Sequence, residues 1–133
     1  MIKKNSNVDI AFMLDATSSM EKNLKAVEDN IAEIVFKIRD AFDNILIRVG
    51  LVAYRDFSEG GFHFKILDLT SDIEEFTRVL GGVRAYRGGD IPEDVLGALD
   101  KTVNLNWKAA NKLLFQIGRY CIHNIIFYEF LQR

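Results

Sequence analysis

Residues 8–19 decide the fold and read VDIAFMLDATSS. The first seven residues are apolar except for one aspartate, and they lack the alternation typical of a strand that faces water on one side. A short, nearly continuous apolar run is typical of a strand buried on both faces, as in a parallel sheet covered by helices. The polar residues 15–19 then predict a turn at the carboxyl end of this strand.

An amphipathic helix is predicted after the turn. Ser18 and Glu21 have the spacing of a capping box, which places the helix start just past the turn. The apolar residues that follow recur at intervals of three and four, as one buried stripe requires. They are Met20, Leu24, Val27, Ile31, Ile34, Ile38 and Ala41.

Strands and helices continue to alternate along the chain. Strands are predicted at residues 45–54, 62–69 and 112–117, and the short connection between the first two predicts an antiparallel hairpin. A second helix is predicted to begin at residues 70–72, with Ser71 and Glu74 as another capping box. The resulting order predicts a doubly wound, Rossmann-like α/β fold with a mostly parallel sheet and one antiparallel edge strand.

A third helix is predicted after the glycine-rich segment 81–89. Asp90 is placed to cap it and Pro92 falls in its first turn. Its apolar residues are Val95, Leu96, Leu99 and Val103. The tail, residues 118–133, is apolar and aromatic, and its pattern fits a strand or a short helix.

Composition limits the classes of function. The 133 residues suit one domain, and a formal net charge of −2 argues against a protein that binds nucleic acid by neutralising many phosphates. No apolar run approaches the length of a membrane helix, so no membrane partner is expected. The single Cys121 excludes an intrachain disulfide and suits a reducing compartment, so we expect a cytoplasmic protein.

Oxygen-bearing side chains follow the first strand at alternate positions. Asp15, Thr17 and Ser19 combine one carboxylate with two hydroxyls in a tight turn, where the three oxygens can converge. Mg²⁺ prefers such oxygen ligands and keeps several waters, and an under-neutralised ion can still accept a carboxylate from a partner. The alternative interpretation is that these residues only cap the helix and satisfy the turn.

The sequence resembles the von Willebrand factor A domain family. The segment D-A-T-S-S, residues 15–19, is similar to the D-x-[ST]-x-S signature of that family. The segments VGLVAYRDF, FKILDLTSDIEEF and GGDIPEDVLGALD are similar to the A domains that accompany alpha-type kinases in protists and fungi. The resemblance covers residues 7–117, which we take as the domain, with 118–133 as a divergent apolar tail.

The resemblance implies a function and a ligand set. It implies a non-enzymatic protein-interaction module that holds Mg²⁺ or Mn²⁺ at a metal-ion-dependent adhesion site. Asp15, Thr17, Ser19 and Asp90 would be its ligands, and an acidic side chain of a protein partner would complete the site. Asp90 stands where many members have a threonine, and capping alone is the alternative role for it.

Two departures from the family pattern support a second hypothesis. Arg119 stands about where the family usually has a third-loop aspartate, and a guanidinium repels a cation. The chain also stops before the last elements of the family, so we expect a truncated or diverged C-terminus. The alternative is a metal-free structural or remnant domain that dimerises through its apolar tail.

Enzymatic hypotheses have little support. A further alternative is a regulatory part of an alpha-kinase-like polypeptide. The chain has only two histidines and shows no credible nucleophile and base set. No phosphate-binding glycine motif follows the first strand either.

Overall fold

A five-stranded sheet forms the centre of the molecule. The computed structural model describes residues 7–17, 20–41, 44–55, 64–85 and 95–118, together with the backbone of 126–129. The strand order is β3-β2-β1-β4-β5. The strands are β1 (Val8–Asp15), β2 (Ile47–Tyr54), β3 (Phe64–Thr70), β4 (Asn111–Ile117) and β5 (Ile126–Glu129).

The pairing of the strands confirms the predicted fold class. β1 lies at the centre and pairs in parallel with β2 and with β4. β3 pairs antiparallel with β2, as the predicted hairpin requires. Part of the apolar tail forms β5, which pairs antiparallel with β4, so this segment is a strand and not a short helix. β2 begins two residues later than predicted, at Ile47, and the predicted first residues of β3, 62–63, lie outside the described residues.

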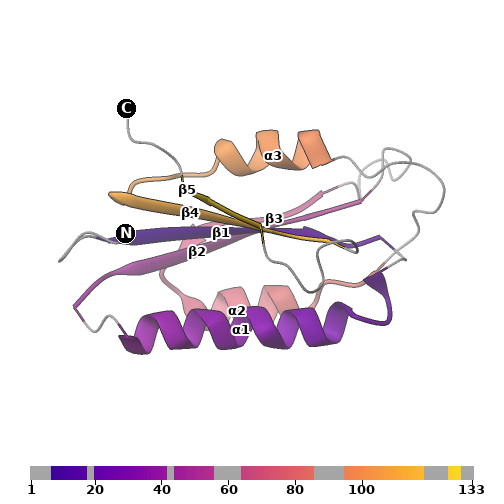
Figure 1. Ribbon diagram of the computed structural model, residues 1–133, viewed down its shortest axis with the longest axis horizontal. Coiled ribbons are helices and arrows are strands. Elements are labelled where there is room, and N and C mark those ends of the chain that lie inside the picture. The colour runs from indigo at the N-terminus through magenta and orange to yellow at the C-terminus, as the bar shows by residue number, and fades with distance from the viewer. Residues whose placement is uncertain are drawn as a thin grey trace.

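Helices cover both faces of the sheet and make three layers (Figure 1). α1 (Leu24–Ala41) and α2 (Ile73–Gly81) lie on one face, and α3 (Val95–Val103) lies on the other. β1 is buried along its whole length because its alternate side chains enter two different cores. Ile10 and Phe12 belong to the core under α1 and α2, whereas Ala11 and Met13 belong to the core under α3. This arrangement explains the continuous apolar run of β1.

α1 begins later than the capping box predicted. Its first residue is Leu24, and the preceding residues 20–23 form turns. The amide of Met20 donates to the carbonyl of Thr17 (2.9 Å), and the amide of Asn23 donates to that of Met20 (2.9 Å). These bonds span three residues, and they bring the Met20 side chain fully into the core before the helix starts. Ser18 lies outside the described residues.

The cap of α2 and the buried face of α3 also differ from prediction. Asp72, not Ser71, caps α2, because its carboxylate accepts from the amide of Glu75 (3.0 Å). α3 buries Ala98 and Thr102, and three of its predicted apolar residues are exposed. They are Leu96, Leu99 and Val103. The small Ala98 and the Thr102 hydroxyl, which donates to the carbonyl of Ala98 (2.7 Å), let the helix lie close to the sheet.

A buried ion pair closes the amino end of the sheet. Asp9 is 1% exposed and accepts from Arg48 Nε and Nη2, both at 2.9 Å. Its Oδ2 also accepts from the amides of Lys108 (2.7 Å) and Ala109 (2.8 Å). The carboxylate therefore holds the segment after α3 against β1 and β2.

In the part of the chain that the structure describes, no helix has the length and apolarity needed to cross a membrane.

Candidate functional site

The candidate site lies at the carboxyl rim, which we define as the sheet edge where β1, β2 and β4 end. Asp15 is the last residue of β1 and pairs in register with Tyr54, the last residue of β2. The amide of Ala16 donates to the carbonyl of Tyr54 (2.9 Å), so the two strands stay joined to their ends. Ligands of open α/β sheets generally bind outside the carboxyl ends of the strands.

Asp15 and Thr17 form a compact oxygen pair at this rim. Asp15 Oδ1 accepts from the backbone amide of Thr17 (2.9 Å) and from its hydroxyl (2.6 Å). Both residues are nearly buried, with 4% and 2% exposed. The amide contact is the local bond that an aspartate makes in a turn, as the capping interpretation predicted. The same geometry also brings a carboxylate and a hydroxyl together at one place.

Two further residues approach the Asp15 carboxylate from the neighbouring strands. Gly118 directly follows β4, and a methyl group added there would lie 3.8 Å from Asp15 Oδ2. The same methyl group would lie 3.8 Å from the hydroxyl of Tyr54. Contacts of this length are ordinary van der Waals distances, so a methyl group at Gly118 would touch both side chains without a clash. The ends of β1, β2 and β4 therefore lie beside one another at the rim.

The segment after α2 is tied to the same edge of the sheet. Arg55 follows β2, and its Nη2 donates to the backbone carbonyl of Arg84 (3.0 Å). Arg84 belongs to the segment 81–85 that leads toward Asp90. The bond anchors the start of that connection beside the end of β2.

The structure thus brings together two of the four predicted metal ligands, Asp15 and Thr17. Ser19 and Asp90 lie outside the described residues, as does Arg119. Within the described ranges, no group of three or more histidine, cysteine, aspartate or glutamate side chains is arranged to hold a metal ion. A site built from one carboxylate and several hydroxyls would not form such a group.

Sequence reasoning missed Tyr54 and Gly118. Tyr54 looked like the end of an apolar strand, and Gly118 looked like the first residue of the tail. The signal was present in the strand ends, because parallel strands in register carry their last residues to one edge. Only the register of the sheet shows which of those residues meet.

Comparison with known proteins gives a matching family model and similar proteins. A model of the von Willebrand factor A domain matches residues 9–115. The alpha-protein kinase vwkA of Dictyostelium discoideum is 28% identical over 109 residues, which is 80% of this chain and 17% of the kinase. A putative ariadne-like RING finger protein of Acanthamoeba polyphaga mimivirus is 31% identical over 86 residues, which is 65% of this chain and 8% of that protein.

A solved structure supports the fold. The pilus adhesin SpaC of Lactobacillus rhamnosus GG, in its open conformation, aligns with a TM-score of 0.51 and 20% sequence identity. The alignment covers 65% of this chain and 11% of the adhesin. The chain thus spans less than a fifth of each of these proteins.

Proposed function

Since the chain belongs to the von Willebrand factor A domain family, a family of protein-interaction modules, we propose that it binds an acidic side chain of a partner protein through Mg²⁺ or Mn²⁺ at the carboxyl rim. Asp15 and Thr17 would be ligands from the first turn, together with Ser19. Asp90 would be the ligand from the connection before α3. The proposed role is non-enzymatic, in a reducing compartment such as the cytoplasm.

The observation that carries the proposal is the buried oxygen pair of Asp15 and Thr17 at the end of the central strand. The atoms that this pair could offer to a metal ion are all oxygens, which suits Mg²⁺ and Mn²⁺ better than zinc. The hydroxyl of Thr17 donates to Asp15 Oδ1, which holds the two oxygens next to each other. Tyr54 and Gly118 lie beside Asp15 at the same end of the sheet.

The chemistry of such a site is binding. A dication held by one carboxylate and neutral hydroxyls keeps a net positive charge and open coordination positions. An incoming carboxylate would complete the shell, and Asp15 would keep its orientation through the amide of Thr17.

Isothermal titration calorimetry with MgCl₂ and MnCl₂ tests the metal. Asp15→Asn keeps the shape of the side chain and an oxygen for the Thr17 amide but removes the charge. We expect it to abolish a millimolar-range binding signal. Asp29→Asn is the matched control, because Asp29 is an exposed carboxylate on α1 that pairs with Lys25 (2.8 Å). Absence of binding by the unaltered chain at millimolar metal contradicts the proposal.

A regulatory role beside a kinase is the alternative that the relatives support. The chain is similar to part of a protein named as an alpha-protein kinase. We propose that such a role would be exerted by binding, not by catalysis. Incubation of the purified chain with ATP and a peptide substrate should therefore give no phosphoryl transfer, and measurable transfer would contradict the non-enzymatic assignment.

A second candidate is a metal-free domain that associates through its apolar tail. The edge position of β5 favours it, since an edge strand can pair with another chain. Light scattering after size exclusion, with and without a chelator, separates the two candidates. A concentration-dependent dimer that is unchanged by the chelator supports the metal-free domain. A monomer that binds metal supports the metal-dependent module.

A further inference from the structure

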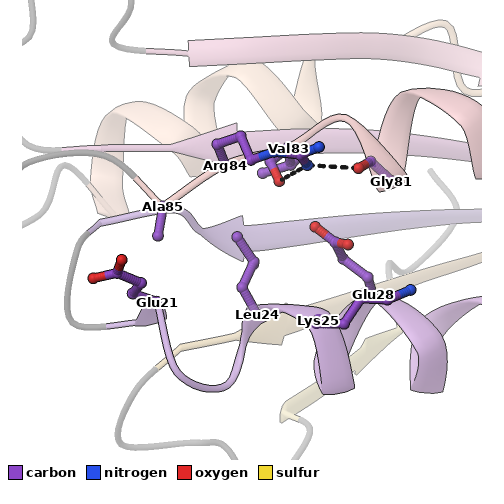
Figure 2. A pocket seen from close by; sticks show the side chains of 8 residues that line it. All are labelled: Glu21, Leu24, Lys25, Glu28, Gly81, Val83, Arg84 and Ala85. Atoms are coloured by element: carbon purple, nitrogen blue, oxygen red, sulfur yellow. Dashed lines mark hydrogen bonds between the residues drawn. The ribbon is translucent and has the colours of Figure 1, made fainter.

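A pocket of about 390 Å³ lies between the first half of α1 and the segment that follows α2 (Figure 2). Two carboxylates, Glu21 and Glu28, and two cations, Lys25 and Arg84, line it together with aliphatic side chains. Arg84 Nη1 donates to the carbonyl of Gly81 (2.7 Å). Because the charges on its wall balance, this pocket favours no class of ligand, and a more selective arrangement lies at the carboxyl rim.

Three residues form a row across the ends of β2, β1 and β4. Tyr54 pairs in register with Asp15. Because Leu14 pairs with Ile117 on the other side of β1, Gly118 comes next to Asp15 in the same register. One strand end thus carries a phenol, the middle one a carboxylate, and the third no side chain.

The row faces the side of the sheet that α3 covers. Tyr54 belongs to the core under α3, as do Met13 of β1 and Leu114 of β4. Side chains alternate between the two faces of a strand, so Asp15, two residues after Met13, lies on the same face as Tyr54. The tyrosine and the carboxylate are therefore neighbours on one face.

The phenol of Tyr54 spans the end of β1. β2 and β4 are not neighbours, because β1 lies between them. Even so, a methyl group on Gly118 would lie 3.8 Å from the hydroxyl of Tyr54 and 3.8 Å from Asp15 Oδ2. The tyrosine side chain therefore crosses from β2 to the end of β4 and brings its hydroxyl to the Oδ2 side of the carboxylate.

The two oxygens of Asp15 have different surroundings. Oδ1 accepts from the amide (2.9 Å) and the hydroxyl (2.6 Å) of Thr17, whereas Oδ2 lies on the side of Tyr54 and Gly118. Asp15 is 4% exposed and Tyr54 is 2% exposed, and buried polar groups are generally satisfied by hydrogen bonds, some of them to ordered water. A position where a methyl group would not clash also accepts a water molecule.

We propose that Tyr54 is a positioning residue for Asp15, and that its hydroxyl and Asp15 Oδ2 share one water molecule beside Gly118. Thr17 and this water hold the carboxylate from both sides, so that its orientation is set before a ligand arrives. The consequence for metal binding rests on the proposed function, because Asp15 is the proposed ligand. The link between the hydroxyl and the carboxylate does not depend on a metal.

A double-mutant cycle in EDTA, followed by urea denaturation, tests the link without metal. Tyr54→Phe removes only the hydroxyl, and Asp15→Ala removes both carboxylate oxygens. Tyr54→Phe should raise the unfolding equilibrium constant about fivefold in the otherwise unaltered chain and less than about twofold in the Asp15→Ala chain, because the shared water can be lost only once. An equal effect in both chains would show a hydroxyl that acts independently of Asp15 and would overturn the proposal.

Amide hydrogen exchange gives a second test that needs no change at Asp15. The amide of Thr17 donates to Asp15 Oδ1, and the neighbouring amide of Ala16 donates to the carbonyl of Tyr54 (2.9 Å). In Tyr54→Phe, the Thr17 amide should exchange at least about threefold faster, because its acceptor is held less firmly, while the Ala16 amide keeps its rate. An unchanged rate at Thr17 contradicts the positioning role.

Thr102→Val is the matched control, because it also removes one buried hydroxyl. That hydroxyl donates to the carbonyl of Ala98 within α3 (2.7 Å). Its loss should have the same effect with and without Asp15→Ala, and it should leave the exchange of the Thr17 amide unchanged. Coupling to Asp15 as large as that of Tyr54→Phe would contradict the assignment to Tyr54.

Calorimetry with MnCl₂ separates this inference from the proposed function. Tyr54→Phe should weaken Mn²⁺ binding about tenfold, as expected when a group that orients a ligand is lost, and Thr102→Val should leave it unchanged. Unchanged affinity in Tyr54→Phe overturns the positioning role. If the unaltered chain binds no Mn²⁺, the proposed function fails, and the cycle and the exchange rates still decide whether Tyr54 holds Asp15.

Discussion

Two buried carboxylates show how the same residue chemistry has opposite consequences. Asp9 accepts hydrogen bonds from Arg48, Lys108 and Ala109, whereas Glu28 accepts none from the described residues. Burial alone would raise the pKa of Asp9, but the bonds and the charge of Arg48 outweigh it, and the pKa is lowered. The pKa of Glu28 is raised, chiefly by burial. The hydrogen bonds of Asp9 therefore hold separate segments of the fold together, whereas Glu28 adds no such bond among the described residues.

The Asp9 pair predicts a pH-dependent loss of stability. Because the folded-state pKa lies below the ordinary value of 3.8, the contribution is complete above that value and is lost as the pH falls through the lowered pKa. Asp9→Asn should lower the free energy of unfolding at neutral pH by about 3 kcal/mol, because Arg48 loses its buried partner. Urea denaturation at several pH values should show the difference from the unaltered chain shrinking in acid.

The control for this prediction is the exposed pair on α1. Asp29→Asn removes the ion-pair partner of Lys25. The side chain of Lys25 is 83% exposed and that of Asp29 is 64% exposed. Its effect should stay within about 0.5 kcal/mol at any pH. An Asp9→Asn effect of similar size would refute the structural role of the pair.

At the scale of elements, local signals selected the helices, but contacts set their ends. Two adjacent residues, Ser71 and Asp72, are both of a residue type that commonly caps the N-terminus of a helix, here α2. The structure uses Asp72, whose own amide donates to the hydroxyl of Thr70 (3.0 Å) while its carboxylate accepts from Glu75. The turn after β3 therefore fixes which residue faces the first turn of α2.

Alanine substitution distinguishes the two caps. Asp72→Ala should lower the free energy of unfolding by about 1 kcal/mol, since an amide of the first turn loses its acceptor. Ser71→Ala should change it by less than about 0.5 kcal/mol, because Ser71 is exposed and is not the cap. Thermal denaturation of both variants measures the effects, and the reverse order would restore the capping box expected from the sequence.

At the scale of the whole molecule, β1 joins two cores into one unit. Phe12 contacts Phe76 of α2 (5.7 Å between ring centroids) and Phe115 of β4 (5.3 Å) on one face. Trp107 packs on the other face, and its Nε1 donates to the carbonyl of Thr102 (2.8 Å). Because one sheet carries both cores, we expect a single cooperative unfolding transition.

Trp107 is the only tryptophan and reports on the α3 face alone. Phe76→Leu, on the opposite face, should lower the free energy of unfolding by about 2 kcal/mol. We expect the Trp107 fluorescence transition in guanidinium to move as far as the circular dichroism transition. Phe36→Leu is the control, because Phe36 is 40% exposed. A Trp107 transition that stays in place would show that the faces unfold separately.

Much of the fold could be read from local pattern. The apolar run of residues 8–14 requires burial on both faces, and the periodicity after it requires a helix, so the layered α/β class and the turn carrying Asp15 and Thr17 follow directly. Details of the other elements did not follow. α3 was expected to bury its leucines, yet Leu96 is 80% exposed, because the contact with the sheet is made through small residues.

The alternation of elements and the oxygen-bearing turn at the end of the central strand could both be predicted from the sequence, because hydrophobic periodicity and turn chemistry are local properties of the chain. The register of the assembled sheet was needed to see which strand ends meet, with Tyr54 and Gly118 beside Asp15. The packing of α1 was likewise needed to see that Glu28, one of many charged residues on that helix, is buried and lines a pocket. These features depend on contacts between segments far apart in the sequence, which local sequence patterns do not predict.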